Sequence, residues 1–321
     1  MAGRILLTGG AGFIGSAILD ALVLAGHRVL VVDDFNDYYD PRTKRENVEA
    51  AVASGLAEIR HVDVRDPDLW AELDADAGWS GVIHMAARAG VRPSLRDPTL
   101  YVSTNVGGTA RVLDWACSGR EPIPFLLASS SSVYGDDYPV PFAESAAPLA
   151  PISPYGASKQ AAEALAQTWQ RIHDLPVAAL RFFTVYGPRQ RPDLAIHKFA
   201  RKIAAGEPIP VYGDGSSARD YTHVEDIVAG VLAALDRLRA GRLQHFAYNL
   251  GSDRGIRLDA MIGAIEQAVG RPAIIDRQPD QPGDVKRTWA DVSRAANELD
   301  YAPSITFEDG VRDFVRWLRR S

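Results

Sequence analysis

The sequence has little cysteine and no long apolar segment. Cys117 is the only cysteine among 321 residues, which excludes an intrachain disulfide and a cysteine-based metal cluster. No apolar run approaches the roughly 20 residues that a membrane-spanning helix needs. The N-terminus enters a strand pattern at once and carries no signal-peptide pattern. We therefore expect a cytoplasmic protein with no membrane partner and no metal site.

Excess positive charge is also lacking. The 35 basic residues are outnumbered by 41 acidic ones, giving a net charge of −6 that argues against a nucleic-acid partner. Only five of the basic residues are lysines, so arginine is the default cation of this chain. An arginine alone is therefore a weak indication of an anion site. The apolar fraction of 46% is ordinary for a globular protein.

The first half alternates short apolar runs with longer helical patterns. This alternation predicts an α/β fold with a Rossmann-type, doubly wound parallel sheet. We expect strands over Arg4–Thr8, Arg28–Asp33, Ala57–Asp63, Gly81–His84, Phe125–Ser129 and Val177–Phe183. We expect helices over Phe13–Ala25, Pro41–Ser54, Pro98–Ser118 and Ser153–His173.

Beyond Gly187-Pro188 the elements become shorter and are broken by glycine and proline. We expect a dinucleotide-binding domain over 1–184 and a smaller substrate-binding α/β lobe over 185–321. Segments between about 221 and 251 are expected to return to the first domain.

A glycine-rich turn follows the first expected strand and opens the first helix. Gly9, Gly12 and Gly15 have the spacing that allows a tight turn, a close approach of pyrophosphate and strand–helix packing. Phe13 and Ile14 lie at the helix N-terminus, whose backbone N–H groups favour phosphate. The pattern predicts a bound dinucleotide.

The ends of the next strands complete the expected cofactor site. Asp33 ends the second strand, where its carboxylate suits ribose hydroxyls and repels a 2′-phosphate, so NAD is favoured over NADP. We interpret His84 as a core histidine. The remaining candidates are Asn36, Asp63, Val64, Ala86 and Ala87, and for Asp63 a simple turn-capping role is equally compatible.

Tyr155 and Lys159 share one face of a helix that Ser153 and Pro154 open. An ammonium near a phenol favours the phenolate and lowers its pKa. A run of serines, Ser129–Ser132, follows the fifth strand at the edge where α/β sheets bind ligands. A serine hydroxyl there can share a proton with the tyrosine.

The glycine turn, the serine run before Val133-Tyr134-Gly135, Tyr155-x-x-x-Lys159 and Arg219-Asp-Tyr221 together resemble the extended short-chain dehydrogenases/reductases that act on nucleotide sugars. The resemblance covers nearly the whole chain. More narrowly, the chain is similar to UDP-glucuronate 4-epimerases. The narrower match lies in Asn36–Pro41, Ala89–Arg92, Arg181–Pro188, Arg191–Asp193 and Gln281–Val285.

The resemblance implies that UDP-glucuronate is converted to UDP-galacturonate through a transient 4-keto sugar, with NAD regenerated in each cycle. Tyr155 takes the proton of the 4-hydroxyl while hydride passes to the nicotinamide, and Lys159 lowers the pKa of the tyrosine and bonds the nicotinamide ribose. Ser130 is the expected proton-sharing hydroxyl, with Ser131 and Ser132 assisting.

Few residues separate this activity from that of its relatives. A 4,6-dehydratase carries an acid/base pair where this chain has Ser131-Ser132, and neutral-sugar epimerases and decarboxylases commonly carry asparagine at Thr184. A β-keto acid loses CO2 unless its carboxylate is held in an unproductive orientation. Thr184 and Arg191 are the expected carboxylate donors, and Arg92 is a second candidate.

The resemblance places the nucleotide in the second lobe, with Arg219 on the diphosphate and Asp284 on ribose. The expected uridine-diphosphate positions are Lys198, Phe199, Val211, Tyr212, Arg219, Gln281 and Asp284. The alternatives, in order, are a UDP-glucose or UDP-N-acetylglucosamine 4-epimerase, a UDP-glucuronate decarboxylase and a non-catalytic NAD-binding sensor. The family also implies a homodimer through a four-helix bundle built from the helices expected at 98–118 and 153–173.

Overall fold

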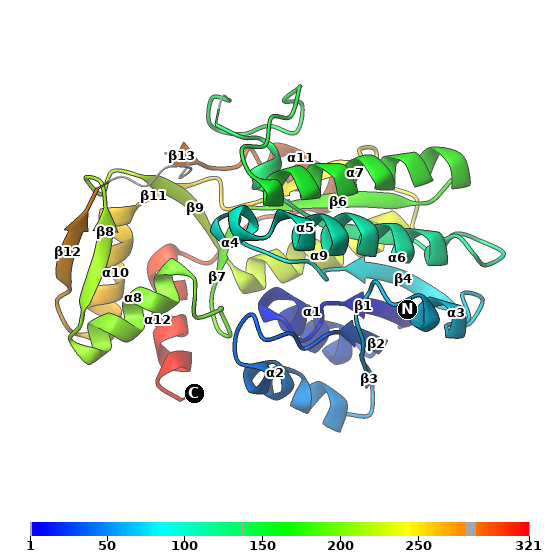
Figure 1. Ribbon diagram of the computed structural model, residues 1–321, viewed down its shortest axis with the longest axis horizontal. Coiled ribbons are helices and arrows are strands. Elements are labelled where there is room, and N and C mark those ends of the chain that lie inside the picture. The colour runs from blue at the N-terminus through cyan, green and yellow to red at the C-terminus, as the bar shows by residue number, and fades with distance from the viewer. Residues whose placement is uncertain (1, 137, 280–286, 321) are drawn as a thin grey trace.

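The computed structural model describes residues 2–136, 138–279 and 287–320. Its larger part is built on a seven-stranded parallel sheet with the order β10-β6-β5-β4-β1-β2-β3 (Figure 1). The strand order reverses beside β1, which confirms the expected Rossmann-type α/β fold. The strands are β1 (Arg4–Thr8), β2 (Arg28–Asp33), β3 (Ala57–His61), β4 (Trp79–His84), β5 (Phe125–Ser130), β6 (Val177–Phe182) and β10 (Ala247–Leu250).

Helices cover both faces of this sheet (Figure 1). Along β1, Ile5 and Leu7 contact one helical layer and Leu6 contacts the other, and all three are fully buried. This alternation follows from the two-residue period of a strand. The first layer contains α1 (Phe13–Leu24), α2 (Pro41–Ala53), α9 (Val224–Arg239) and α11 (Ser293–Leu299), and the second contains α3 (Pro67–Glu72), α6 (Thr109–Ala116) and α7 (Pro154–His173).

The helix expected over 98–118 is divided into three parts. Helix α5 (Pro98–Val102) passes into a π-helical segment, η1 (Ser103–Gly108), before α6 begins. The wide turn places Asn105 so that its side-chain amide donates to Ser158 Oγ of α7 at 2.9 Å. A π-helical turn holds about one residue more than an α-helical turn, and the apolar pattern of the sequence does not indicate where this happens.

The second part of the molecule has a separate hydrophobic core between three helices and short sheets (Figure 1). Its helices are α8 (Ala195–Ala205), α10 (Leu258–Val269) and α12 (Phe307–Leu318). Strand β8 (Pro208–Tyr212) pairs with β12 (Ile274–Gln278), and β9 (Ala218–His223) pairs with β7 (Thr184–Tyr186), β11 (Gly255–Arg257) and β13 (Arg287–Thr288). Strand β10 joins the main sheet beside β6, where α11 contacts it, and α9 packs against β6 and β4.

Two short elements lie between the larger ones, α4 (Val91–Arg96) and the 3₁₀ turn η2 (Ser131–Val133). Across the described ranges, no helix combines the length and apolar character that a membrane span requires.

Candidate active site

A cavity of about 440 Å³ opens where the carboxyl ends of the central parallel strands meet. It brings together residues that are far apart in the sequence, from the glycine turn after β1 to the first turn of α7. Every residue expected to bind the cofactor lines it, and so do all three candidate serines, Thr184 and Arg191. Open α/β sheets bind ligands at this edge.

The three glycines of the turn face different constraints. Gly9 has a φ of +68°, and a Cβ on Gly15 would stand 2.1 Å from the carbonyl oxygen of Gly9, so the fold itself requires both glycines. A Cβ on Gly12 would meet only that same oxygen, at an ordinary 3.4 Å. The protein thus has room for a side chain at Gly12, and the space in front of it is left to a ligand.

Asp33 is fixed at the end of β2 by the same turn. Its Oδ2 accepts a hydrogen bond from Ala11 N at 3.0 Å and its Oδ1 accepts one from Phe35 N at 2.9 Å. Burial raises the pKa of the carboxyl, and these two bonds and the charge of Lys44 oppose that rise. Each oxygen keeps a second lone pair, which can accept a ribose hydroxyl.

Three further groups around the cavity carry a buried polar atom without a hydrogen-bond partner among the described residues. They are Tyr39 through its hydroxyl, Arg88 through Nε and Thr104 through Oγ1. Buried polar groups in folded proteins are normally paired. The free space at Gly12 and these unpaired donors fit a bound dinucleotide.

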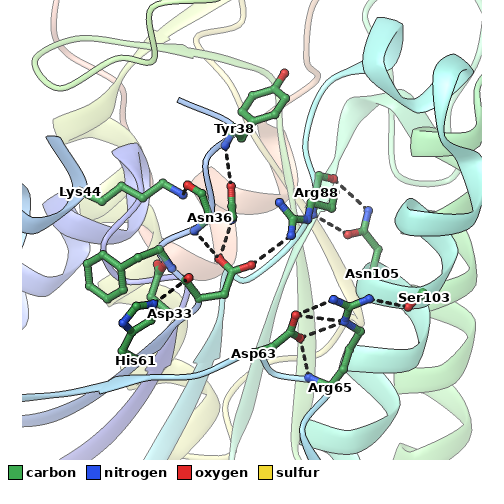
Figure 2. A network of polar contacts seen from close by, with 12 residues as sticks. Asp33, Asn36, Tyr38, Lys44, His61, Asp63, Arg65, Arg88, Ser103 and Asn105 are labelled. Atoms are coloured by element: carbon green, nitrogen blue, oxygen red, sulfur yellow. Dashed lines mark hydrogen bonds and ion pairs between the residues drawn. The ribbon is translucent and has the colours of Figure 1, made fainter. Parts of the chain in front are cut away.

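Asp63 and Asn36 are already engaged within the protein (Figure 2). Arg65 donates to both carboxylate oxygens of Asp63, with a shortest distance of 2.6 Å. Asn36 accepts from Lys44 Nζ through its backbone carbonyl at 2.8 Å. Asp63 therefore presents a neutralised carboxylate to the cavity.

Both ring nitrogens of His84 are bonded, Nδ1 to Thr8 Oγ1 at 2.7 Å and Nε2 to Thr109 Oγ1 at 3.0 Å. Complete burial lowers the pKa of this histidine to about 3. His84 is thus a neutral core residue, as the sequence indicated.

Helix α7 brings Tyr155 and Lys159 to the cavity wall. The helix begins where expected, since Ser153 Oγ accepts from Gly156 N at 3.1 Å and Pro154 occupies the first turn. Burial raises the pKa of Tyr155, and a hydrogen bond from Ser130 and the charge of Arg191 lower it. The sequence assigned this lowering to Lys159, whose Nζ instead donates to Ala128 O at 2.8 Å.

Burial lowers the pKa of Lys159 to about 8, and the Glu163 carboxylate one turn further along α7 opposes that shift. The lysine still carries a proton at neutral pH. It lies beside the end of β5, from which the candidate serines follow. Tyr155, Lys159 and Ser130 are therefore gathered at one wall of the cavity.

Thr184 and Arg191 also line the cavity. The guanidinium of Arg191 donates through Nε and Nη2 to the two oxygens of Asp193, both at 3.1 Å. Its central carbon lies 5.2 Å from the ring centroid of Tyr38, whose hydroxyl donates to Asp193 at 3.3 Å. Arg191 is thus a cation beside Tyr155 that already has one internal carboxylate partner.

Of the described residues, neither those expected to bind the nucleotide nor Arg92, the second carboxylate candidate, line this cavity. Arg92 lies with its guanidinium 5.4 Å from the ring centroid of Tyr212, and Arg219 donates to Ala218 O at 3.0 Å. Phe199 and Val211 pack in the core of the second lobe, while Lys198 is exposed on α8. Gln281 and Asp284 lie outside the described residues.

Sequence reasoning missed several residues of the cavity, among them Asp34, Tyr39, Arg88 and Thr104. Two of them follow motifs that had been recognised: Asp34 is next to Asp33, and Arg88 follows the small residues Ala86 and Ala87. Nothing in the sequence marks Thr104, because the π-helical segment places it at the cavity.

The family model of NAD dependent epimerases/dehydratases matches residues 5–251. The chain belongs to this family. It is 38% identical to UDP-glucuronate 4-epimerase 4 of Arabidopsis thaliana, covering 98% of this chain and 74% of that protein. It is 36% identical to UDP-glucuronate 4-epimerase of Thermodesulfobacterium geofontis, over 99% and 97% of the two chains.

A solved structure gives the same picture in three dimensions. The UDP-glucuronic acid 4-epimerase of Bacillus cereus, in complex with UDP-glucuronic acid and NAD, superposes with a TM-score of 0.89 at 30% identity. The similarity covers 99% of both chains. The family resemblance inferred from the motifs is therefore confirmed, and both lobes share it.

Proposed function

We propose that the protein converts UDP-glucuronate to UDP-galacturonate by NAD-dependent epimerisation at C4, without loss of CO2. The observation that supports this best is the placement of Thr184 and Arg191 on the same cavity as Tyr155 and Lys159. One cavity thus holds Tyr155, which can transfer a proton, and two side chains that can donate hydrogen bonds to a carboxylate. The similarity to enzymes named for this reaction, over nearly the whole chain, favours the same conclusion.

Bound NAD supplies a reversible hydride acceptor for C4 of the sugar. Tyr155 takes the proton of the 4-hydroxyl and later returns it, and Ser130, whose side chain lowers the pKa of the tyrosine, shares that proton. The cation of Arg191 favours the phenolate. We assign Lys159 to the ribose beside the reacting ring, with Ser131 and Ser132 holding the sugar.

Holding the carboxylate is as important as oxidising C4. The keto sugar is a β-keto acid, which loses CO2 when its carboxylate bond stands perpendicular to the ketone plane. Hydrogen bonds donated by the Thr184 hydroxyl and the Arg191 guanidinium would hold the carboxylate bond out of this perpendicular orientation. Since Thr184 begins β7, its backbone is fixed by pairing with β9.

We also propose a division between the lobes. Residues 1–184, with segments returning from about 221–251, bind NAD, and residues 185–321 bind the uridine diphosphate. The candidates for the nucleotide remain Lys198, Phe199, Val211, Tyr212, Arg219, Gln281 and Asp284, and Arg92 remains the second candidate for the carboxylate. We propose a homodimer, because apolar side chains are exposed on α4, α5 and α7. We also propose that the protein works in the cytoplasm.

One observation favours a second candidate, a neutral-sugar UDP-hexose 4-epimerase. Asp193 already neutralises Arg191 through two hydrogen bonds, so the pocket need not receive an anion. A substrate carboxylate must displace Asp193 or share the guanidinium with it.

Incubation with UDP-glucuronate, UDP-glucose and UDP-N-acetylglucosamine in turn, without added NAD, separates the candidates by NMR of the sugar. Galacturonate from the first substrate supports the proposal, a pentose indicates decarboxylation, and turnover of the neutral sugars alone overturns it. The Tyr155→Phe variant is the control, because it should retain NAD and lose at least about 100-fold in turnover. No turnover of any of the three substrates by a protein that has NAD bound would indicate a non-catalytic NAD-binding sensor.

A further inference from the structure

An ion pair joins the two loops that flank the glycine turn, and Figure 2 draws it as the dashed line that runs from Arg88 to an unlabelled carboxylate, that of Asp34. Asp34 directly follows β2, and Arg88 lies in the loop after β4. Strands β2 and β4 are the two neighbours of β1 in the sheet. Arg88 Nη2 donates to Asp34 Oδ2 at 3.1 Å, so this contact crosses the end of β1 from one side to the other.

Both partners of the ion pair are held in place by other bonds. Asp34 Oδ1 accepts from the backbone and side-chain nitrogens of Asn36, at 3.1 and 2.5 Å. The backbone of Arg88 is bound twice by the Asn105 side chain, through N–H at 2.7 Å and C=O at 3.0 Å. The two side chains are only 17% and 26% exposed. Little side-chain freedom is therefore lost when they pair, unlike in a typical surface ion pair.

The ion pair borders the path that a dinucleotide must take. Both residues line the same cavity as Asp33 and Lys159. A ligand reaching from Asp33, at the end of β2, to Lys159, beside the end of β5, passes the ends of β1 and β4. The ion pair runs along this same edge of the sheet.

We propose that the Asp34–Arg88 ion pair is a latch that closes the cofactor cavity and slows the exchange of bound dinucleotide. The proposal rests on the proposed function only in taking NAD as the ligand. Such a latch suits a reaction that returns its hydride to the same sugar, because the cofactor must stay in place between the two transfers. Arg88 Nε, which has no partner among the described residues, is left to donate to the ligand.

The test is the rate at which bound NADH leaves the protein. The holoprotein loaded with NADH is mixed with excess NAD, and the loss of bound-NADH fluorescence gives the dissociation rate. Asp34→Asn should raise this rate about five-fold, the effect of one partly buried ion pair. Arg88→Gln should raise it at least as much, since it also removes the Nε donor.

The double variant decides whether the two residues act as one unit. Asp34→Asn with Arg88→Gln should release NADH no faster than Arg88→Gln alone, because the bond can be lost only once. Single variants within two-fold of the wild-type rate, or a double variant whose rate is the product of the single effects, would overturn the latch. Glu58→Gln is the matched control, because it breaks the exposed Arg60–Glu58 ion pair on β3 and should leave the rate unchanged.

No sugar is present in this experiment. Slow NADH release that depends on the ion pair, in a protein that turns over no nucleotide sugar, would support the latch and contradict the proposed function. Thermal unfolding of each variant shows whether a faster release only reflects a weakened fold.

Discussion

At the scale of single residues, Gly12 and Gly15 differ although one motif contains both. A Cβ on Gly15 would collide with the backbone of the turn at 2.1 Å, whereas a Cβ on Gly12 would lie at a normal distance from it. Gly12 has a φ of −71°, which any residue can adopt. The first glycine therefore serves the ligand and the second serves the packing of α1 on β1.

We expect Gly12→Ala to fold like the wild type and to bind NAD roughly ten-fold or more weakly, because its methyl group fills the space for the pyrophosphate. Gly15→Ala should lower the free energy of unfolding by about 1–3 kcal/mol, the usual cost of overpacking. Thermal unfolding and NAD titration of both variants check this. Equal loss of stability in the two would show that Gly12 is structural.

Thr184 gives a prediction about the product rather than the rate. Thr184→Val keeps the shape of the side chain and removes its donor, and a hydrogen bond to a charged group contributes about 1.5–3 kcal/mol. The fraction of turnovers that end in pentose and CO2 should rise roughly ten-fold, as followed by NMR of the products. Thr168→Val, on the exposed face of α7, is the control and should keep the wild-type product ratio. An unchanged product ratio in Thr184→Val would show that Arg191, and not Thr184, holds the carboxylate.

At the scale of elements, a buried network ties β5, α7 and β6 together behind the proposed reacting groups. Glu163 of α7 accepts from Ser129 Oγ of β5 at 2.5 Å and from Arg181 of β6 at 2.9 and 2.7 Å. Arg181 also donates to Tyr134 at 3.0 Å, and Tyr134 donates to Asn249 of β10 at 2.7 Å. The network holds the strand end before Ser130 against the helix that carries Tyr155 and Lys159.

Glu163 also acts on the charge of Lys159, so its loss has a pH signature. Its carboxylate opposes the fall in the pKa of the buried lysine, which lies at about 8. In Glu163→Gln that pKa should fall further, and activity that needs the ammonium should be lost at a pH lower by on the order of one unit. Arg181 of β6 pairs with the same Glu163 carboxylate, and His84 on β4 stays neutral. The measurement is kcat against pH, and only the basic limb should move.

Breaking one side of a buried ion pair also costs stability, roughly 3–5 kcal/mol. Glu163→Asp separates the two effects, because it keeps the charge and disturbs only the geometry. If the basic limb of Glu163→Asp moves as far as that of Glu163→Gln, the charge of Glu163 has no role in the pH profile.

The elements that the sequence predicted well are those with a strong local pattern. Strands β1 and β2 have the expected bounds because each is a short apolar run ended by a turn, and α7 begins at its serine cap. The π-helical segment and the Asp34–Arg88 ion pair escaped prediction. The π-helical segment adds one residue to a helical turn, and the apolar pattern of the sequence does not mark the place. Asp34 and Arg88 are 54 positions apart and meet only when the sheet forms.

At the scale of the whole molecule, one face of the larger lobe carries apolar side chains that a monomer leaves in water. Leu95 on α4, Val102 on α5 and Ile172 on α7 are 59%, 53% and 63% exposed. Helices α5 and α7 contact each other on the same face of the main sheet. Two helices from each of two subunits can bury these side chains together, which is the proposed four-helix bundle.

We expect light scattering to give a mass of twice 34.8 kDa. Val102→Arg should shift the protein to the monomer mass, because the bundle would have to bury an unpaired charge. Leu24→Arg is the matched control: Leu24 is 91% exposed at the end of α1, on the opposite face of the sheet, and its replacement should leave the dimer intact. A wild-type mass of one subunit would contradict the homodimer, and a dimer that survives Val102→Arg but not Leu24→Arg would move the interface to the α1 face.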